Sequence, residues 1–127
     1  MLVNDFLEQT ATKTPHKEAL IFQQQRLTYL ELDNFANALG NALLGLGLQK
    51  LDRVAIYLEN SVEAVVAIFG ILKAGGVFLL INPQTKARKL EYILNDCQVR
   101  FLITDSKLGL NCQDLRADLQ EIGRAHV

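Results

Sequence analysis

Apolar positions in the first part of the chain recur at helical spacing. A segment near Val3–Lys13 has this spacing, and Pro15 ends it because proline cannot continue a helix. The longest such pattern predicts one face of a long helix, formed by Leu32, Phe35, Leu39, Leu43 and Leu46. Between these two patterns, short apolar runs at Glu18–Phe22 and Arg26–Thr28 flank three glutamines and predict a hairpin.

From residue 53 onward the pattern changes to continuous apolar runs. These runs are Val54–Leu58, Val77–Ile81 and Val99–Thr104, and such runs are typical of parallel strands buried on both faces. Helical patterns at Val62–Lys73 and Lys86–Asp96 separate them. The order strand, helix, strand, helix, strand predicts an α/β fold, a partial parallel-sheet layer with right-handed crossover helices.

The segment Val62–Lys73 is apolar around nearly its whole circumference, which predicts a helix buried on both sides. A three-stranded sheet can cover only one side. We expect the chain to be too short to supply the other cover, and therefore to be part of a larger body.

Five short sequence features predict where helices and strands begin or end. Thr28 and Glu31 form a capping box ahead of the long helix, and glycines at 45 and 47 can end it. Gly75–Gly76 follows a helix and precedes a strand, the reverse of a phosphate-binding loop, so it predicts a turn. Asn82–Pro83 ends a strand. Ser61 follows a strand, where open α/β sheets bind ligands, but it is better interpreted as a helix N-cap.

Composition and residue spacing give no support for several classes of function. The chain has 127 residues, 50% of them hydrophobic, and a net charge of −1, which gives no support for nucleic-acid binding. A basic cluster at Lys86, Arg88 and Lys89 is interpreted as a solvated helix face, with an anion contact as the alternative. Neither the cysteines (97 and 112) nor the histidines (16 and 126) have the spacing of a metal site or a catalytic pair. No apolar run spans a bilayer and no secretion signal is present, so we expect a cytoplasmic protein.

Two segments resemble the first core motifs of the adenylate-forming (AMP-binding) enzymes. They are Leu27-Thr28-Tyr29-Leu30-Glu31-Leu32 and Leu72-Lys73-Ala74-Gly75-Gly76-Val77-Phe78-Leu79-Leu80-Ile81-Asn82-Pro83. Three shorter segments fit the same family in the same order, namely Asp52-Arg53-Val54-Ala55-Ile56, Tyr92-Ile93-Leu94-Asn95-Asp96 and Leu102-Ile103-Thr104. The resemblance therefore covers most of the chain and implies an incomplete N-terminal portion of the large AMP-binding domain.

The resemblance implies a parent ligase that uses ATP and Mg²⁺ to convert a carboxylic acid into an acyl-adenylate, and then transfers the acyl group to CoA. In that family a Ser/Thr/Gly-rich phosphate loop and a C-terminal lysine serve the chemistry, and this sequence contains neither. We therefore assign no catalytic, cofactor-binding or metal-binding residue, and expect no cofactor to bind the chain and no activity from it alone.

The family branch depends on one position. Asn82 before Pro83 looks more like acyl-CoA synthetases than like peptide-synthetase adenylation domains, which usually carry aspartate there. The alternatives are a peptide-synthetase adenylation domain, a complete small α/β binding module, or a naturally truncated chain that pairs with another protein.

The last seven residues, Glu121–Val127, differ from the rest of the chain in their possible origin. They back-translate as GAGATCGGAAGAGCACACGTC, which matches a widely used sequencing adapter. We therefore expect residues 1–120 to be the incomplete AMP-binding domain and residues 121–127 to be a non-native tail.

Overall fold

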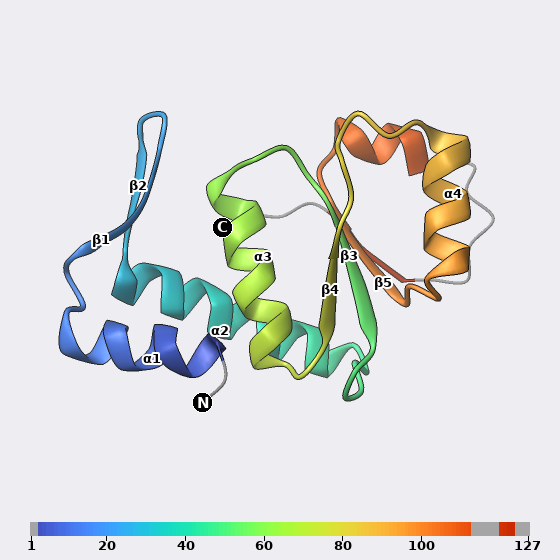
Figure 1. Cartoon of the computed structure of the whole chain (residues 1–127). Coiled ribbons are helices and arrows are strands. Elements are labelled where there is room, and N and C mark those ends of the chain that lie inside the picture. The colour runs from blue at the N-terminus through green and yellow to red at the C-terminus, as the bar shows by residue number, and fades with distance from the viewer. Residues whose placement is uncertain (1–2, 113–119, 124–127) are drawn as a thin grey trace.

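The computed structural model describes residues 3–112 and 120–123 (Figure 1). Its helices are α1 (Val3–Lys13), α2 (Tyr29–Gly45), α3 (Val62–Lys73), α4 (Ala87–Asp96) and the 3₁₀ helix η1 (Leu108–Cys112). Its strands are β1 (Glu18–Phe22), β2 (Gln25–Thr28), β3 (Arg53–Tyr57), β4 (Val77–Leu80), β5 (Phe101–Thr104) and β6 (Gln120–Gly123). Strands β1 and β2 form an antiparallel hairpin, and the other four form a parallel sheet in the order β4-β3-β5-β6. The predicted α/β class and its two strand–helix–strand units are confirmed.

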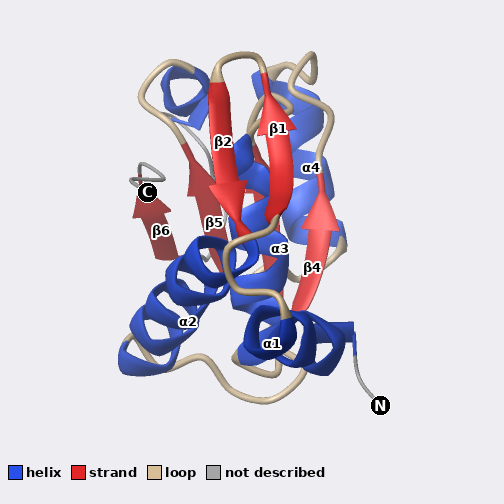
Figure 2. Cartoon of the chain, turned by 90° about the vertical axis from the view of Figure 1, so that its left-hand side faces the viewer, coloured by secondary structure: helices blue, strands red, loops and turns tan. Residues whose placement is uncertain are grey.

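The helices cover both faces of the parallel sheet (Figures 1 and 2). Alternate side chains of β3 and β5 pack on one face against α2 and α3, through residues that include Val54, Ile56, Phe101 and Ile103. The intervening side chains pack on the other face against α4 and η1. Residues 101–104 are all buried, as are residues 54–57, and this burial explains why the sequence of these strands is continuously apolar.

The predicted elements match the structure to within one or two residues at each end, but β6 and η1 were not predicted. Strand β6 has the sequence Gln-Glu-Ile-Gly, which lacks the apolar run of its neighbours, and its pairing with β5 shifts register between Leu102 and Ile103. Strand β4 lies at the other edge of the sheet, where Val77 and Leu80 are exposed.

The predicted helix ends are confirmed. The Glu31 amide donates to Thr28 Oγ1 at 3.1 Å and the Thr28 amide donates to the Glu31 carboxylate at 2.9 Å. Gly47 ends α2 and Gly75 ends α3, both with positive φ. At the end of α3 the amides of Gly76 and Gly75 donate to the carbonyls of Ile71 and Leu72, a Schellman motif that satisfies two otherwise unpaired carbonyls.

Helix α3 is buried on both sides, as predicted, but the expectation that this chain cannot cover it is wrong. No residue of α3 is exposed. One side packs on the parallel sheet, and the other contacts α1, α2 and the hairpin in a separate apolar cluster of Leu7, Leu27, Leu32, Val62 and Val66. Sequence periodicity showed that cover was needed, but it could not show that the first 45 residues fold back to provide it (Figure 2).

Helices α2 and α3 approach each other so closely that positions 40 and 70 have little or no room for a side chain at the crossing. A Cβ atom on Gly70 would lie 2.8 to 2.9 Å from side-chain atoms of Leu39, and one on Gly40 would lie 3.1 Å from the Gly70 carbonyl oxygen. Glycine at these two positions therefore permits the close packing that holds α3 against the sheet.

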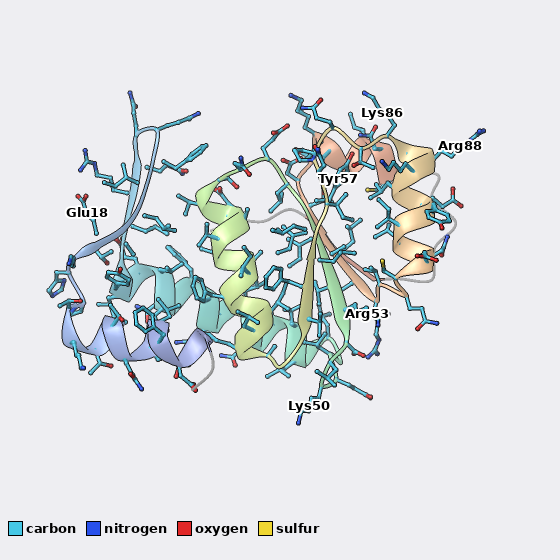
Figure 3. The ribbon with its side chains drawn as sticks, viewed as in Figure 1. Glu18, Lys50, Arg53, Tyr57, Lys86 and Arg88 are labelled. Atoms are coloured by element: carbon cyan, nitrogen blue, oxygen red, sulfur yellow. The ribbon has the colours of Figure 1, made fainter. Side chains whose placement is uncertain are left out.

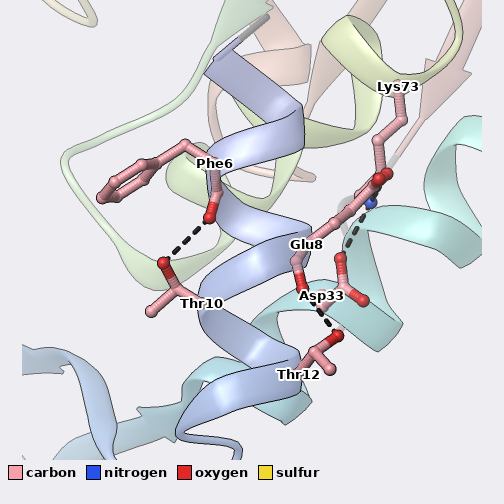
Figure 4. A network of polar contacts seen from close by, with 6 residues as sticks. All are labelled: Phe6, Glu8, Thr10, Thr12, Asp33 and Lys73. Carbon is pink, nitrogen blue, oxygen red and sulfur yellow. Dashed lines mark hydrogen bonds and ion pairs between the residues drawn. The ribbon is translucent and has the colours of Figure 1, made fainter. Parts of the chain in front are cut away.

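Lys73 joins the three helices at this crossing (Figure 4). Its Nζ lies 2.7 Å from Glu8 Oε1 on α1 and 2.8 Å from Asp33 Oδ1 on α2, and its side chain is only 7% exposed. Burial alone would lower the pKa of Lys73, but the contacts with Asp33 and Glu8 outweigh it and raise that pKa. Asp33 Oδ1 is itself buried, and apart from this ion pair it has no hydrogen-bond partner among the described residues, so its charge depends on Lys73.

We predict that Gly70→Ala destabilises the fold by about 1–3 kcal/mol, because the new methyl group overlaps Leu39. Gly45→Ala is the matched control, since no atom lies within 4 Å of its added Cβ; this change should be neutral or stabilising by up to about 1 kcal/mol. Urea denaturation of both variants measures the difference. Equal midpoints for the two variants would contradict the close approach.

We predict that Lys73→Met destabilises the chain by about 1–3 kcal/mol, because Asp33 then carries a half-buried charge without a partner. Adding Asp33→Asn to that variant should restore part of the lost stability, and Lys89→Met, at an exposed position, is the control.

Since the pKa of Lys73 is raised on folding, the contribution of Lys73 to the free energy of unfolding is complete below about pH 10 and is lost as the pH rises through the folded-state pKa. Denaturation midpoints against pH would show a steeper alkaline loss in the unmodified chain than in Lys73→Met. Parallel curves would contradict this assignment.

Candidate functional site

The carboxyl edge of the parallel sheet is the candidate site. Strand β3 leads into α3 on one face, whereas β4 leads into α4 and β5 into η1 on the other. The chain therefore leaves neighbouring strands in opposite directions, and open α/β sheets commonly bind ligands in the crevices this creates. Two pockets lie at this edge, one on each side of the end of β3.

The larger pocket, about 480 Å³, lies between the ends of β3 and β4. Its apolar lining is Ile56, Leu58, Ala64, Leu80, Ile81 and Pro83. Its polar lining is Glu59, Asn60, Asn82 and Gln84. An apolar floor with a few polar groups is typical of small-molecule sites. The polar groups here are amides and one carboxylate.

The smaller pocket, about 260 Å³, lies between the ends of β3 and β5 and carries three carboxylates. They belong to Glu59, Glu63 and Asp105, and among the described residues that line the two pockets there is no lysine, arginine or histidine. A triphosphate placed in the smaller pocket would be repelled by these carboxylates.

Ser61 lines the smaller pocket, but its hydroxyl oxygen caps the N-terminus of α3. Ser61 Oγ accepts a hydrogen bond from the Ala64 amide at 3.1 Å, which confirms the predicted N-cap of α3. A hydroxyl that caps a helix is held in one orientation and is not an activated nucleophile, which would need an adjacent base.

Tyr57 was not singled out by its sequence pattern, yet it makes the most polar contacts at this edge. The side chain is fully buried near η1 (Figure 3). Its hydroxyl donates to the Thr85 carbonyl oxygen at 2.6 Å and accepts from Asn111 Nδ2 at 2.9 Å. In sequence Tyr57 is one apolar residue of a strand, and its partners lie 28 and 54 positions away, so no local signal predicts them.

The other predicted residues lie outside these pockets. Gly75–Gly76 forms the turn between α3 and β4, at the opposite edge, as predicted. Lys86, Arg88 and Lys89 are exposed at the start of α4, which fits the predicted solvated face; the first two are labelled in Figure 3. Both cysteines are partly buried and neither forms a disulfide. His16 is exposed, and His126 lies outside the described residues.

Within the described part of the chain, no three histidine, cysteine or acidic side chains are grouped as metal ligands would be. No helix in that part is long and apolar enough to cross a membrane.

Nearly the whole chain is similar to parts of known proteins. The sequence profile of the AMP-binding enzyme family matches residues 7–126. Bacitracin synthase 1 of Bacillus licheniformis is 36% identical over 124 residues, which cover 96% of this chain and 2% of that protein. The nonribosomal peptide synthetase FmoA3 superposes with a TM-score of 0.91 at 31% identity, covering 100% of this chain and 13% of the other.

Two more similar structures are a peptide-synthetase di-domain and a CoA ligase. An artificially fused adenylation–PCP di-domain from Klebsiella oxytoca, NpsA–ThdA, has a TM-score of 0.84 at 27% identity and covers 95% of this chain and 22% of the other. The anthranilate CoA ligase AuaEII has a TM-score of 0.86 at 32% identity and covers 94% of this chain and 24% of the other. The chain thus spans less than a third of each of these relatives.

The peptide-synthetase alternative is favoured over the predicted acyl-CoA synthetase, since peptide synthetases predominate among the relatives. At position 82 the structure shows a local turn contact: Asn82 Oδ1 accepts from the Gln84 amide at 2.8 Å, and an aspartate could accept the same bond. The sheet, the ordered motifs and the matched profile together place this chain in the AMP-binding enzyme family, as part of the N-terminal region of an adenylate-forming enzyme.

Proposed function

We propose that the parent protein activates a carboxylic acid with ATP and Mg²⁺ and passes the resulting acyl group to a carrier-bound thiol, as an adenylation domain of the peptide-synthetase type. The observation that carries this proposal is the match to FmoA3 over the entire chain, together with the 36% identity to bacitracin synthase 1. Of the two peptide-synthetase structures named above, NpsA–ThdA is an adenylation domain artificially fused to a PCP domain.

A CoA acceptor is the second candidate. The match to the anthranilate CoA ligase AuaEII, at 32% identity, favours it. The motifs of this chain form helix caps, turns and buried strands, and these roles do not distinguish the two acceptors. The acceptor must therefore be decided by experiment.

We propose that this chain contributes scaffold and no chemistry, with no catalytic, cofactor-binding or metal-binding residue. The acidic lining of the carboxyl edge and the committed hydroxyl of Ser61 support this. Phosphoryl chemistry needs a phosphate cradle and a metal, and the described residues offer neither an aimed cationic cluster at the pockets nor a ligand group. We further propose a cytoplasmic location, which fits the partly buried thiols of Cys97 and Cys112 outside any disulfide.

We also propose that residues 121–127 are not native sequence. These residues can be back-translated as an adapter sequence, and β6, which contains residues 121–123, has a polar sequence and an irregular register beside three regular apolar strands. Sequencing the contiguous genomic DNA should show the adapter-like codons replaced by codons for a more apolar strand. Finding GAGATCGGAAGAGCACACGTC in the genome would contradict this proposal.

The parent protein should exchange radiolabelled pyrophosphate into ATP only when a suitable carboxylic acid is supplied, because exchange requires reversible formation of an acyl-adenylate. The 127-residue chain should show no exchange above buffer under the same conditions. A panel of amino acids and aryl acids identifies the substrate class. Acid-independent exchange by the parent, or acid-dependent exchange by this chain, would contradict the proposal.

The same preparation decides the acceptor. With the preferred acid and ATP, the parent should acylate its cognate carrier protein bearing phosphopantetheine, detected as a mass increase of the carrier. Free CoA in place of the carrier is the matched comparison. Efficient acyl-CoA formation without carrier acylation would assign the parent to the CoA-ligase branch.

A further inference from the structure

The two loops at the carboxyl edge are each ordered by a local turn. In the loop after β4, Asn82 accepts hydrogen bonds from the amides of Gln84 and Thr85, at 2.8 and 2.9 Å. In the loop after β5, Asp105 accepts bonds from the amides of Leu108 and Gly109, at 2.7 and 2.8 Å. These bonds fix the internal shape of each loop, but they do not attach either loop to the strands.

Tyr57 supplies that attachment for both loops at a single atom. Its hydroxyl bonds Thr85 in the first loop and Asn111 in η1, so its one proton and a lone pair are both used. Its main-chain carbonyl accepts from Thr104 Oγ1 at 2.9 Å, which ties the end of β5 to the same residue. The ring itself packs among apolar residues of the α4 face, where phenylalanine would fill nearly the same space. The hydroxyl is therefore what distinguishes tyrosine at this position.

The next residues of the chain connect this attachment to the two pockets. The side chain of Leu58 lies on the opposite face of the sheet from Tyr57, and Leu58 and Glu59 line both pockets. The first loop provides Asn82, Pro83 and Gln84 to the larger pocket, and the second provides Asp105 to the smaller one. Both pockets therefore have one wall whose position depends on the Tyr57 hydroxyl.

We propose that Tyr57 is a positioning residue that couples the two loops, so that the pockets on either side of β3 change shape together. Removing the hydroxyl leaves the Thr85 carbonyl and the Asn111 amide without their shared partner in a part-buried place, and both loops then open locally. A group that enters one pocket and displaces its loop would shift the other loop through the same atom. This coupling is independent of the reaction that the parent catalyses.

Hydrogen exchange resolved by residue tests the coupling on the 127-residue chain. In Tyr57→Phe, the amides of Gln84 and Thr85 in one loop and of Leu108 and Gly109 in the other should all exchange on the order of tenfold faster. The amides of Ile81 and Val99, which bond the Ile56 and Leu94 carbonyls, report on the body of the fold and should change less than about twofold. Tyr92→Phe, at a side chain that is 67% exposed, is the matched control and should change neither loop.

Asn111→Ala gives an independent test, because it removes only one arm of the contact. Leu108 and Gly109 should exchange faster, whereas Gln84 and Thr85 should keep their protection through the remaining bond from Tyr57 to Thr85. Three results would overturn the proposal. They are acceleration of only one loop in Tyr57→Phe, equal acceleration of Ile81 and Val99 in that variant, and no acceleration of Leu108 and Gly109 in Asn111→Ala.

Discussion

The close approach of α2 and α3 is the constraint on which the rest of the structure depends. Glycine at positions 40 and 70 lets the two helices meet closely, with the Leu39 side chain directly on Gly70, and this contact holds α3 against the sheet. Because α3 is apolar on every side, its burial requires both the sheet and the first two helices. Lys73 secures the same crossing with two ion pairs, one to each of the other helices.

The two edges of the parallel sheet differ in what their polar groups do. The glycine turn that ends α3 and the ion pair between Asp52 and Arg100, at 2.6 Å, lie toward the amino edge of the sheet. The carboxyl edge instead carries two pockets, their walls joined through Tyr57 and their charge negative. Within the described residues, polar groups are thus used mainly to hold loops and helix ends, which fits a scaffold region of an adenylate-forming enzyme.

Local patterns predicted the elements well because each depends on neighbours in sequence. The capping box at Thr28 and Glu31, the cap at Ser61 and the turn at Gly75 involve residues within a few positions of one another. The pockets, the Tyr57 contacts and the cover of α3 could not be predicted, because they join segments separated by tens of residues. Asn82 was interpreted as a sign of the acyl acceptor, and the structure shows that its side chain makes a local turn contact with Gln84.

The central claim is that this region supports the chemistry without taking part in it. A crystal structure of the parent protein with a non-hydrolysable acyl-adenylate analogue tests that claim most directly. The account predicts that residues 3–112 keep the arrangement described above, with every contact to the adenylate made by residues outside them. A phosphate, ribose or acyl group of the analogue seated against Glu59, Ser61 or Asp105 would contradict it.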